Sequence, residues 1–177
     1  MKRMFGGMQA AGWLLSLAML GNPAQAIEIG DPAPEFQLQG LSSTVKLSDA
    51  SGKLVYLDYW ASWCGPCRQS FPWMNELQSR YGSQGLQVVA VNLDAKPEDA
   101  RRFLEMQPAS FAVAFDPKGQ TPRLYGVKGM PSSFLIGRDG KVLWRHTGFK
   151  GSDKAELEQQ IAAALKLKTH AAMNAPQ

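Results

Sequence analysis

The sequence predicts an α/β fold: one mixed central sheet with helices on both faces. Apolar, β-prone runs alternate along the chain with segments whose apolar residues recur every three or four positions. Such strand–helix alternation implies right-handed parallel crossovers. Near the C-terminal end, two further β-prone runs flank Arg138-Asp139-Gly140-Lys141, and an Asp-Gly pair is typical of a hairpin turn. The hairpin adds an antiparallel edge to the sheet.

The individual elements follow from local patterns. Residues 54–61 and 86–93 are apolar and β-prone nearly throughout, which predicts two strands buried on both faces. Apolar residues at spacings of three and four from Phe71 to Tyr81 predict an amphipathic helix. The other expected elements are strands at 44–47, 111–115, 133–136 and 142–146, helices at 97–107 and from about 153, and a helical turn at 121–125.

The length and composition fit one domain. The 177 residues are 45% hydrophobic, which is enough for a core but too little chain for two ordinary domains. The formal charge of +4 comes without a run of Lys or Arg, so no nucleic-acid partner is predicted. The two cysteines are too few for a disulfide-dense mini-protein.

Residues 1–26 have the pattern of a secretory signal peptide. Lys2 and Arg3 form a basic start, residues 10–20 an apolar run, and Ala24-Gln25-Ala26 a small-x-small cleavage site. The apolar run is about half of the roughly 20 residues that a transmembrane helix needs. We expect cleavage before Ile27 and a periplasmic protein; an uncleaved membrane anchor and a buried N-terminal helix are the alternatives.

The predicted domain spans residues 27–167. Pro32 and Pro34 enforce an extended, non-helical entry into it. Residues 168–177 lack any periodicity and are expected to be a disordered tail.

The chemistry is concentrated in Trp63-Cys64-Gly65-Pro66-Cys67, which lies between a predicted strand and a predicted helix. A cysteine at a helix N-terminus is stabilised as a thiolate by free N–H groups and the helix dipole, so its pKa falls from about 8.5 into the range of roughly 3.5–7.5. Pro66 suits the first turn, where its missing N–H costs nothing. We expect Cys64 to be the nucleophile and Cys67, one turn on, to resolve the mixed disulfide.

Two other uses of this cysteine pair are weaker. A purely structural disulfide that closes a four-residue ring removes little entropy from the unfolded chain. A zinc site needs four ligands, and the only histidines are His146 and His170, the second of which lies in the tail. No metal and no cofactor is therefore predicted.

The stretch LDYWASWCGPC, residues 57–67, resembles the active site of thioredoxins, down to the identical Cys-Gly-Pro-Cys. Pro72 matches the proline that bends the active-site helix, Gly129-Met130-Pro131-Ser132 the loop with a cis-proline, and Gly148 the glycine of the last strand. The entry segment IGDPAPEFQL and an extra helix–strand unit between Asp94 and Asp116 resemble the exported TlpA/ResA-type subgroup.

This resemblance implies a thioredoxin fold for residues 27–167. It also implies which residues contact the substrate. A cis Pro131 would expose the Met130 backbone for strand-like pairing with a substrate peptide. Trp63, Gly65 and Pro66, beside the cysteines, are the other expected substrate contacts.

Asp58 is the third expected catalytic residue. It lies in a strand expected to be buried, where desolvation raises a carboxyl pKa, and it could take the proton of Cys67 as a general base. The alternative is a surface aspartate at the end of a strand. The chain departs from the subgroup here, because the subgroup often has asparagine in place of Asp58 and glutamate in place of Ser70.

The leading hypothesis is an exported protein-disulfide reductase that acts on cysteine-containing envelope proteins. The resemblance implies a role in cytochrome c biogenesis and a transmembrane thiol carrier as electron donor. One alternative is a peroxiredoxin-like peroxidase, disfavoured because Ala61 stands where that group's Thr-x-x-Cys motif has threonine. Another is a copper-binding assembly factor, which would carry Cys-x-x-x-Cys and a partnering histidine.

Overall fold

The computed structural model describes residues 27–167. The predicted signal peptide 1–26 and the predicted tail 168–177 lie outside the described residues. The strands are β1 (Gln37–Gly40), β2 (Thr44–Lys46), β3 (Leu54–Trp60), β4 (Leu86–Asn92), β5 (Ala112–Phe115), β6 (Ser132–Ile136) and β7 (Val142–Thr147). The helices are α1 (Gly65–Tyr81), α2 (Pro97–Met106), α3 (Gln120–Leu124) and α4 (Lys154–Lys166), with short 3₁₀ turns η1 (Leu47–Ala50), η2 (Gly82–Gln84) and η3 (Gly151–Asp153).

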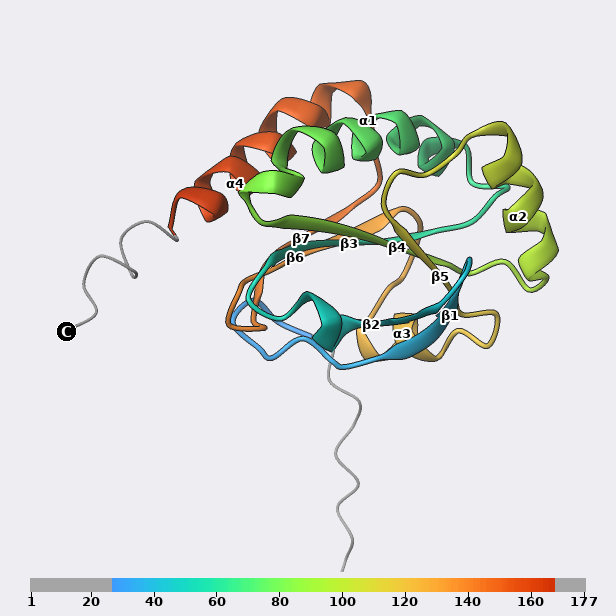
Figure 1. Cartoon of the computed structure of the whole chain (residues 1–177), viewed down its shortest axis with the longest axis horizontal. Coiled ribbons are helices and arrows are strands. Elements are labelled where there is room, and N and C mark those ends of the chain that lie inside the picture. The colour runs from blue at the N-terminus through green and yellow to red at the C-terminus, as the bar shows by residue number, and fades with distance from the viewer. Residues whose placement is uncertain (1–26, 168–177) are drawn as a thin grey trace, which may run out of the picture.

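The described strands form one mixed sheet in the order β2-β1-β5-β4-β3-β6-β7 (Figure 1). β3 pairs in parallel with β4, and β4 with β5, whereas β6 runs antiparallel to both β3 and β7. Every residue of β3 is buried, as expected of a central strand covered on both faces. The predicted fold class, including the antiparallel hairpin edge, is confirmed.

The sequence did not reveal β1, which pairs antiparallel with both β2 and β5. Its four residues, Gln-Leu-Gln-Gly, follow closely on Pro32 and Pro34, and the sequence predicts only an extended entry there, so tertiary pairing defines this strand. Together β1 and β2 extend the sheet beyond β5 (Figure 1).

Different kinds of segment cover the two faces of the sheet. α1, α2 and α4 bury their apolar sides in one cluster, which also contains both cysteines. On the opposite face, the segment around Phe36, the turn η1 and Tyr125, just after α3, build a second cluster. Figure 1 shows α1 and α4 above the sheet and α3 below it. Helices thus lie on both faces as predicted, but non-helical chain covers much of the second.

The central strands end where the predicted site begins. β3 ends at Trp60, its carbonyl accepts a hydrogen bond from the Leu93 N–H (2.9 Å), and the chain turns into α1 within four residues. The loop that precedes β6 lies at the same edge of the sheet, because β6 pairs with β3 from Ser132 onward. In the described residues, no helix is both long and apolar enough to cross a membrane.

Candidate active site

Cys64 is the N-cap residue of α1. Its backbone is extended (φ −80°, ψ 107°), and its sulfur accepts the N–H of Cys67 at 3.3 Å. Pro66 occupies the first turn of the helix, where its missing N–H leaves no intrahelical hydrogen bond unmade. This geometry places the Cys64 sulfur in the positive field of a helix terminus, where a thiolate is stabilised.

Cys64 and Cys67 are joined in a disulfide, with their Cα atoms 5.2 Å apart. Cys64 retains 6% of its surface, whereas Cys67 retains none. Cys64 is therefore the more accessible of the two residues to an incoming sulfur. The asymmetry fits the predicted roles of nucleophile for Cys64 and resolving cysteine for Cys67.

The two tryptophans before the cysteines have different environments. Trp60 is fully buried, and its ring packs against Phe71 (4.5 Å between centroids) and Phe103 (5.1 Å). Trp63 is 72% exposed directly beside Cys64. Trp60 thus anchors α1 to the core, while Trp63 offers an apolar surface next to the more exposed sulfur, together with the exposed Gly65 and Pro66.

The Met130-Pro131 peptide bond is cis, as the resemblance implied. The Pro131 carbonyl accepts the N–H of Gly148 at 2.8 Å, and the Ser132 hydroxyl donates to the Gly129 carbonyl at 2.7 Å. Gly148 has φ +89°, a left-handed conformation that favours glycine. Met130 is half-buried and packs against the apolar cluster that contains both cysteines. Ser132 pairs with Tyr59 near the end of β3, so this loop lies at the same edge of the sheet as the disulfide.

Asp58 faces the same side of the sheet as α1. Side chains alternate along a strand, so Asp58 shares a face with Tyr56 and Trp60. The ring of Tyr56 meets Trp73 of α1 at 5.6 Å, and Trp60 meets Phe71 of the same helix. Asp58 lies between these two contacts, on the face of the sheet that α1 covers. It is 1% exposed, which contradicts the alternative of a surface aspartate.

Few polar groups surround the carboxyl of Asp58. Its Oδ1 accepts a hydrogen bond from the Ser133 hydroxyl at 2.8 Å, while Oδ2 has no partner in the described part of the chain. On the β4 side its neighbour is Ala90. Burial raises the pKa of Asp58 to about 7, and the hydrogen bond from Ser133 partly opposes this rise. A carboxyl with this pKa both accepts and releases protons near neutral pH.

Two polar residues near the cysteine motif, Asp94 and Ser70, were not among the predicted site residues. Asp94 is buried and accepts the N–H of Ser62 (3.1 Å to Oδ2) and the side-chain amide of Asn92 (2.8 Å), which ties the loop before Cys64 to the end of β4. An acidic residue directly after a predicted buried strand was the available signal. Ser70 donates to the Cys67 carbonyl at 2.9 Å, so its hydroxyl serves the helix backbone.

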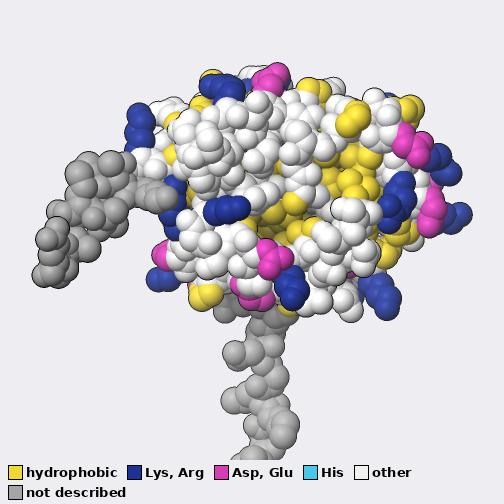
Figure 2. All heavy atoms as spheres, viewed as in Figure 1, with side chains coloured by type: hydrophobic (Ala, Val, Ile, Leu, Met, Phe, Trp, Pro, Cys, Tyr) yellow, Lys and Arg dark blue, Asp and Glu magenta, His cyan; other side chains and the backbone are white. Residues whose placement is uncertain are grey.

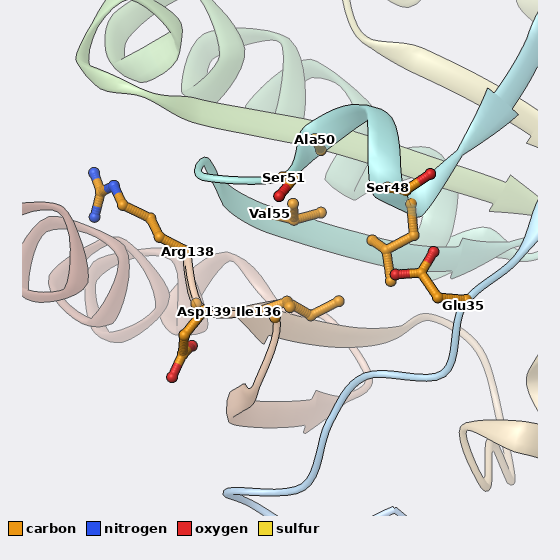
Figure 3. Close-up of a pocket in the computed structure, with 11 residues that line it drawn as sticks. Glu35, Ser48, Ala50, Ser51, Val55, Ile136, Arg138 and Asp139 are labelled. Atoms are coloured by element: carbon orange, nitrogen blue, oxygen red, sulfur yellow. The ribbon is translucent and has the colours of Figure 1, made fainter.

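The cavity in Figure 3 lies away from the cysteines. It measures about 280 Å³ and opens between η1 and the turn that joins β6 to β7, lined among others by Glu35, Ser48 and Val55. The Arg138 side chain points away from the other labelled residues, toward α4, where it donates to the Ala164 carbonyl (3.3 Å). None of the predicted site residues lines this cavity.

Two further observations concern surface charge and metal-ligand geometry in the described residues. On the face shown in Figure 2, Lys and Arg are interspersed with Asp and Glu around a patch of hydrophobic side chains. Within residues 27–167, no group of three or more His, Cys, Asp or Glu side chains is arranged to hold a metal ion.

A cysteine pair at a helix N-terminus, a cis-proline loop beside it and this sheet define a thiol–disulfide oxidoreductase of thioredoxin fold. The chain belongs to the Redoxin family, whose model matches residues 28–161. Within that family it is a TlpA/ResA-type thioredoxin-like oxidoreductase.

Similar proteins agree with this assignment. The chain is 35% identical over 133 residues to the thiol-disulfide oxidoreductase ResA of Bacillus thuringiensis subsp. konkukian. The aligned residues cover 75% of this chain and 77% of that protein. It is 36% identical over 138 residues to ResA of Geobacillus thermodenitrificans, with 73% and 79% covered. A crystal structure described as a thiol:disulfide interchange protein DsbE from Chlorobium tepidum is 67% identical, with a TM-score of 0.78, and covers 79% of this chain and 99% of that one.

The burial of Asp58 predicts a pH-dependent stability of the oxidised protein. An unfolded aspartate ionises near pH 3.9, whereas the pKa of folded Asp58 is raised to about 7. The folded state therefore binds the extra proton, and the free energy of unfolding falls by about 4 kcal/mol as the pH rises from about 4 to 7. In Asp58→Asn this loss disappears, so the variant is the more stable protein at pH 8.

Denaturant unfolding of both proteins between pH 4 and 8, with the disulfide intact, measures this difference. The control is Glu105→Gln, which neutralises an exposed acid on α2 and leaves the pH profile in place. Parallel profiles for wild type and Asp58→Asn would contradict the assigned environment of Asp58.

Proposed function

We propose that the chain is exported and reduces disulfides in cysteine-containing proteins of the cell envelope. The observation that carries this proposal is the position of Cys64 as N-cap of α1, with Cys67 bonded to it from one turn further along. The more exposed sulfur attacks the substrate and the buried sulfur releases it. The reducing direction is supported by the Cys-Gly-Pro-Cys motif and Asp58, both of which follow thioredoxin.

The reaction starts from the dithiol form of the protein. The Cys64 thiolate attacks one sulfur of a substrate disulfide; the mixed disulfide forms, the substrate S–S bond breaks, and the leaving thiolate takes a proton from water. Cys67 then loses its proton, and its sulfur attacks the sulfur of Cys64. This second step forms the Cys64–Cys67 disulfide, breaks the mixed disulfide and releases the second substrate thiolate. Two electrons pass to the substrate, and a dithiol donor must restore the protein.

Asp58 acts as general base in the second step. The free Oδ2 of its buried carboxylate takes the proton that leaves Cys67, and a pKa near 7 suits this exchange at neutral pH. The first step needs no such help, because the helix terminus stabilises the Cys64 thiolate. Trp63, Gly65, Pro66 and the Met130 backbone contact the substrate peptide around the reacting sulfurs.

The partners follow from the compartment. The signal pattern in residues 1–26 supports export to the periplasm, where disulfides persist and electrons must come through the membrane. We infer a transmembrane thiol carrier as the electron donor and envelope proteins with cysteine pairs, such as apocytochrome c, as substrates. No observation in the described residues favours the peroxidase or copper-binding alternatives.

Variants of each cysteine test the assigned order of attack. Cys67→Ser removes the resolving sulfur and accumulates mixed disulfides between Cys64 and its substrates in cells, whereas Cys64→Ser accumulates none. Non-reducing electrophoresis and identification of the trapped proteins measure this, with the double serine variant as control. Trapping by Cys64→Ser alone would reverse the two roles. Trapped partners confined to the cytosol would contradict export.

The base role of Asp58 predicts a selective kinetic defect. Asp58→Asn slows release of the mixed disulfide by about 10²–10⁴-fold at neutral pH, the usual size of general-base assistance, and slows the initial attack by Cys64 far less. Single-turnover reduction of a disulfide peptide separates the two steps. Unchanged release in Asp58→Asn would leave water or the thiolate itself as the base.

A further inference from the structure

A chain of two hydroxyl groups ends on Asp58. Tyr56 Oη donates to the Ser133 hydroxyl oxygen at 2.8 Å, and that hydroxyl donates to Asp58 Oδ1, also at 2.8 Å. All three side chains are buried. Because Tyr56 already occupies an acceptor position of the Ser133 oxygen, the single proton of Ser133 is directed to Asp58.

We propose that Ser133 is a positioning residue for the reaction, oriented by Tyr56, and that it sets the pH range in which Asp58 accepts the proton of Cys67. The inference rests on the proposed function, in which Asp58 is the base. Both hydroxyls form their hydrogen bonds along the path to Asp58 rather than to a reacting sulfur, so both act through the carboxyl of Asp58.

The sheet register creates this arrangement. Ser133 lies directly opposite Asp58 across the antiparallel pair β3–β6, and Tyr56 precedes Asp58 by two residues on the same face. Ser133 also follows Pro131 by two residues. The strand that carries the cis-proline loop therefore also carries the hydrogen-bond donor to the buried carboxyl.

Few groups around Asp58 can influence the pKa of its carboxyl, so Ser133 has a large effect on that pKa. Tyr56 and Trp60 share the face of β3 with Asp58, and Ala90 lies beside it on β4. Cys67 of α1 belongs to the same apolar cluster as Tyr56, Trp60 and Ala90. The titratable groups among these are Tyr56 and Cys67. Burial, and next the charge of Asp58, raise the pKa of Tyr56 well above its ordinary value, so Tyr56 stays a proton donor throughout the working pH range.

The two carboxyl oxygens of Asp58 consequently have different tasks. Oδ1 is held by Ser133, which fixes the orientation of the carboxyl and stabilises its charged form. Oδ2 lacks a partner in the described residues and is free to exchange a proton. Without Ser133 the carboxylate would lose its hydrogen bond in a site where burial already disfavours its charge.

The first test needs no activity. Carbon-13 NMR of the Asp58 carboxyl follows its titration in the oxidised full domain, before and after Ser133→Ala. We expect the midpoint to rise by about one pH unit in Ser133→Ala. It stays within a few tenths of a unit in Ser133→Thr, which keeps the hydroxyl. An unchanged midpoint in Ser133→Ala overturns the proposal.

Tyr56→Phe is the second, milder variant and keeps the ring against Trp73. This variant loses only the hydroxyl that donates to Ser133. The midpoint of the Asp58 titration therefore rises by less than it does in Ser133→Ala. In the double variant Tyr56→Phe adds nothing to Ser133→Ala, because it acts through Ser133. Additive shifts would contradict that route. If Ser133→Ala does not fold, the Tyr56→Phe shift alone decides, and its absence overturns the proposal.

Kinetics then separate this inference from the base role itself. The pH profile for release of the mixed disulfide moves with the Asp58 midpoint in Ser133→Ala, and it does not move when Ser133→Ala is placed in the Asp58→Asn background. A purely structural role of Ser133 would lower stability without moving the profile. If Asp58→Asn leaves release unchanged, the base role fails, while the NMR titration still decides whether Ser133 controls Asp58.

Discussion

The free amide groups at the N-terminus of α1 are the feature on which the site depends. A helix leaves its first N–H groups without intrahelical partners, and here one of them, on Cys67, meets the sulfur of Cys64. The same turn that brings the two sulfurs within bonding distance gives them unlike surroundings. Cys64 sits in the positive end of the helix with part of its surface open, and Cys67 lies fully inside the core. Two chemically identical side chains thereby receive different roles.

The surrounding structure holds this helix terminus in place. Trp60 and Phe71 lock the start of α1 onto the sheet, and the carboxylate of Asp94 fixes the loop before Cys64 through the N–H of Ser62. Asp58 is a polar residue among the otherwise apolar side chains that pack between β3 and α1. A buried carboxyl with one hydrogen bond costs stability at neutral pH, and an apolar residue would fit the strand better. A buried carboxyl with a strongly raised pKa, on the face of the sheet that α1 covers, is what one expects of a group retained for proton transfer.

Much of the site could be predicted because its chemistry depends on short sequence spacing. The cysteines, Pro66 and the following helix lie within one local segment. Pro131 and Gly148 were identified from the resemblance to thioredoxins, the first by its loop and the second as the glycine of the last strand. The hydroxyl chain on Asp58 was not predictable in this way. Tyr56 and Asp58 share a face because side chains alternate along a strand, but the pairing of Asp58 with Ser133 joins residues 75 positions apart, and no local pattern fixes that register. β1 was missed because its four residues form a short run close behind Pro32 and Pro34, where the sequence predicts only an extended segment. The central strands were found because burial on both faces makes them continuously apolar.

The central claim is that the helix terminus and burial separate the two thiols in their ionisation. Titration of the reduced domain, followed by thiolate absorbance in the ultraviolet, measures this directly, with Cys64→Ser and Cys67→Ser to assign the steps. We expect one thiolate to form below about pH 7.5 and to vanish in Cys64→Ser, and the second to form only above about pH 8.5 and to vanish in Cys67→Ser. Two thiols that ionise together near pH 8.5, or Cys67 ionising first, would contradict the account.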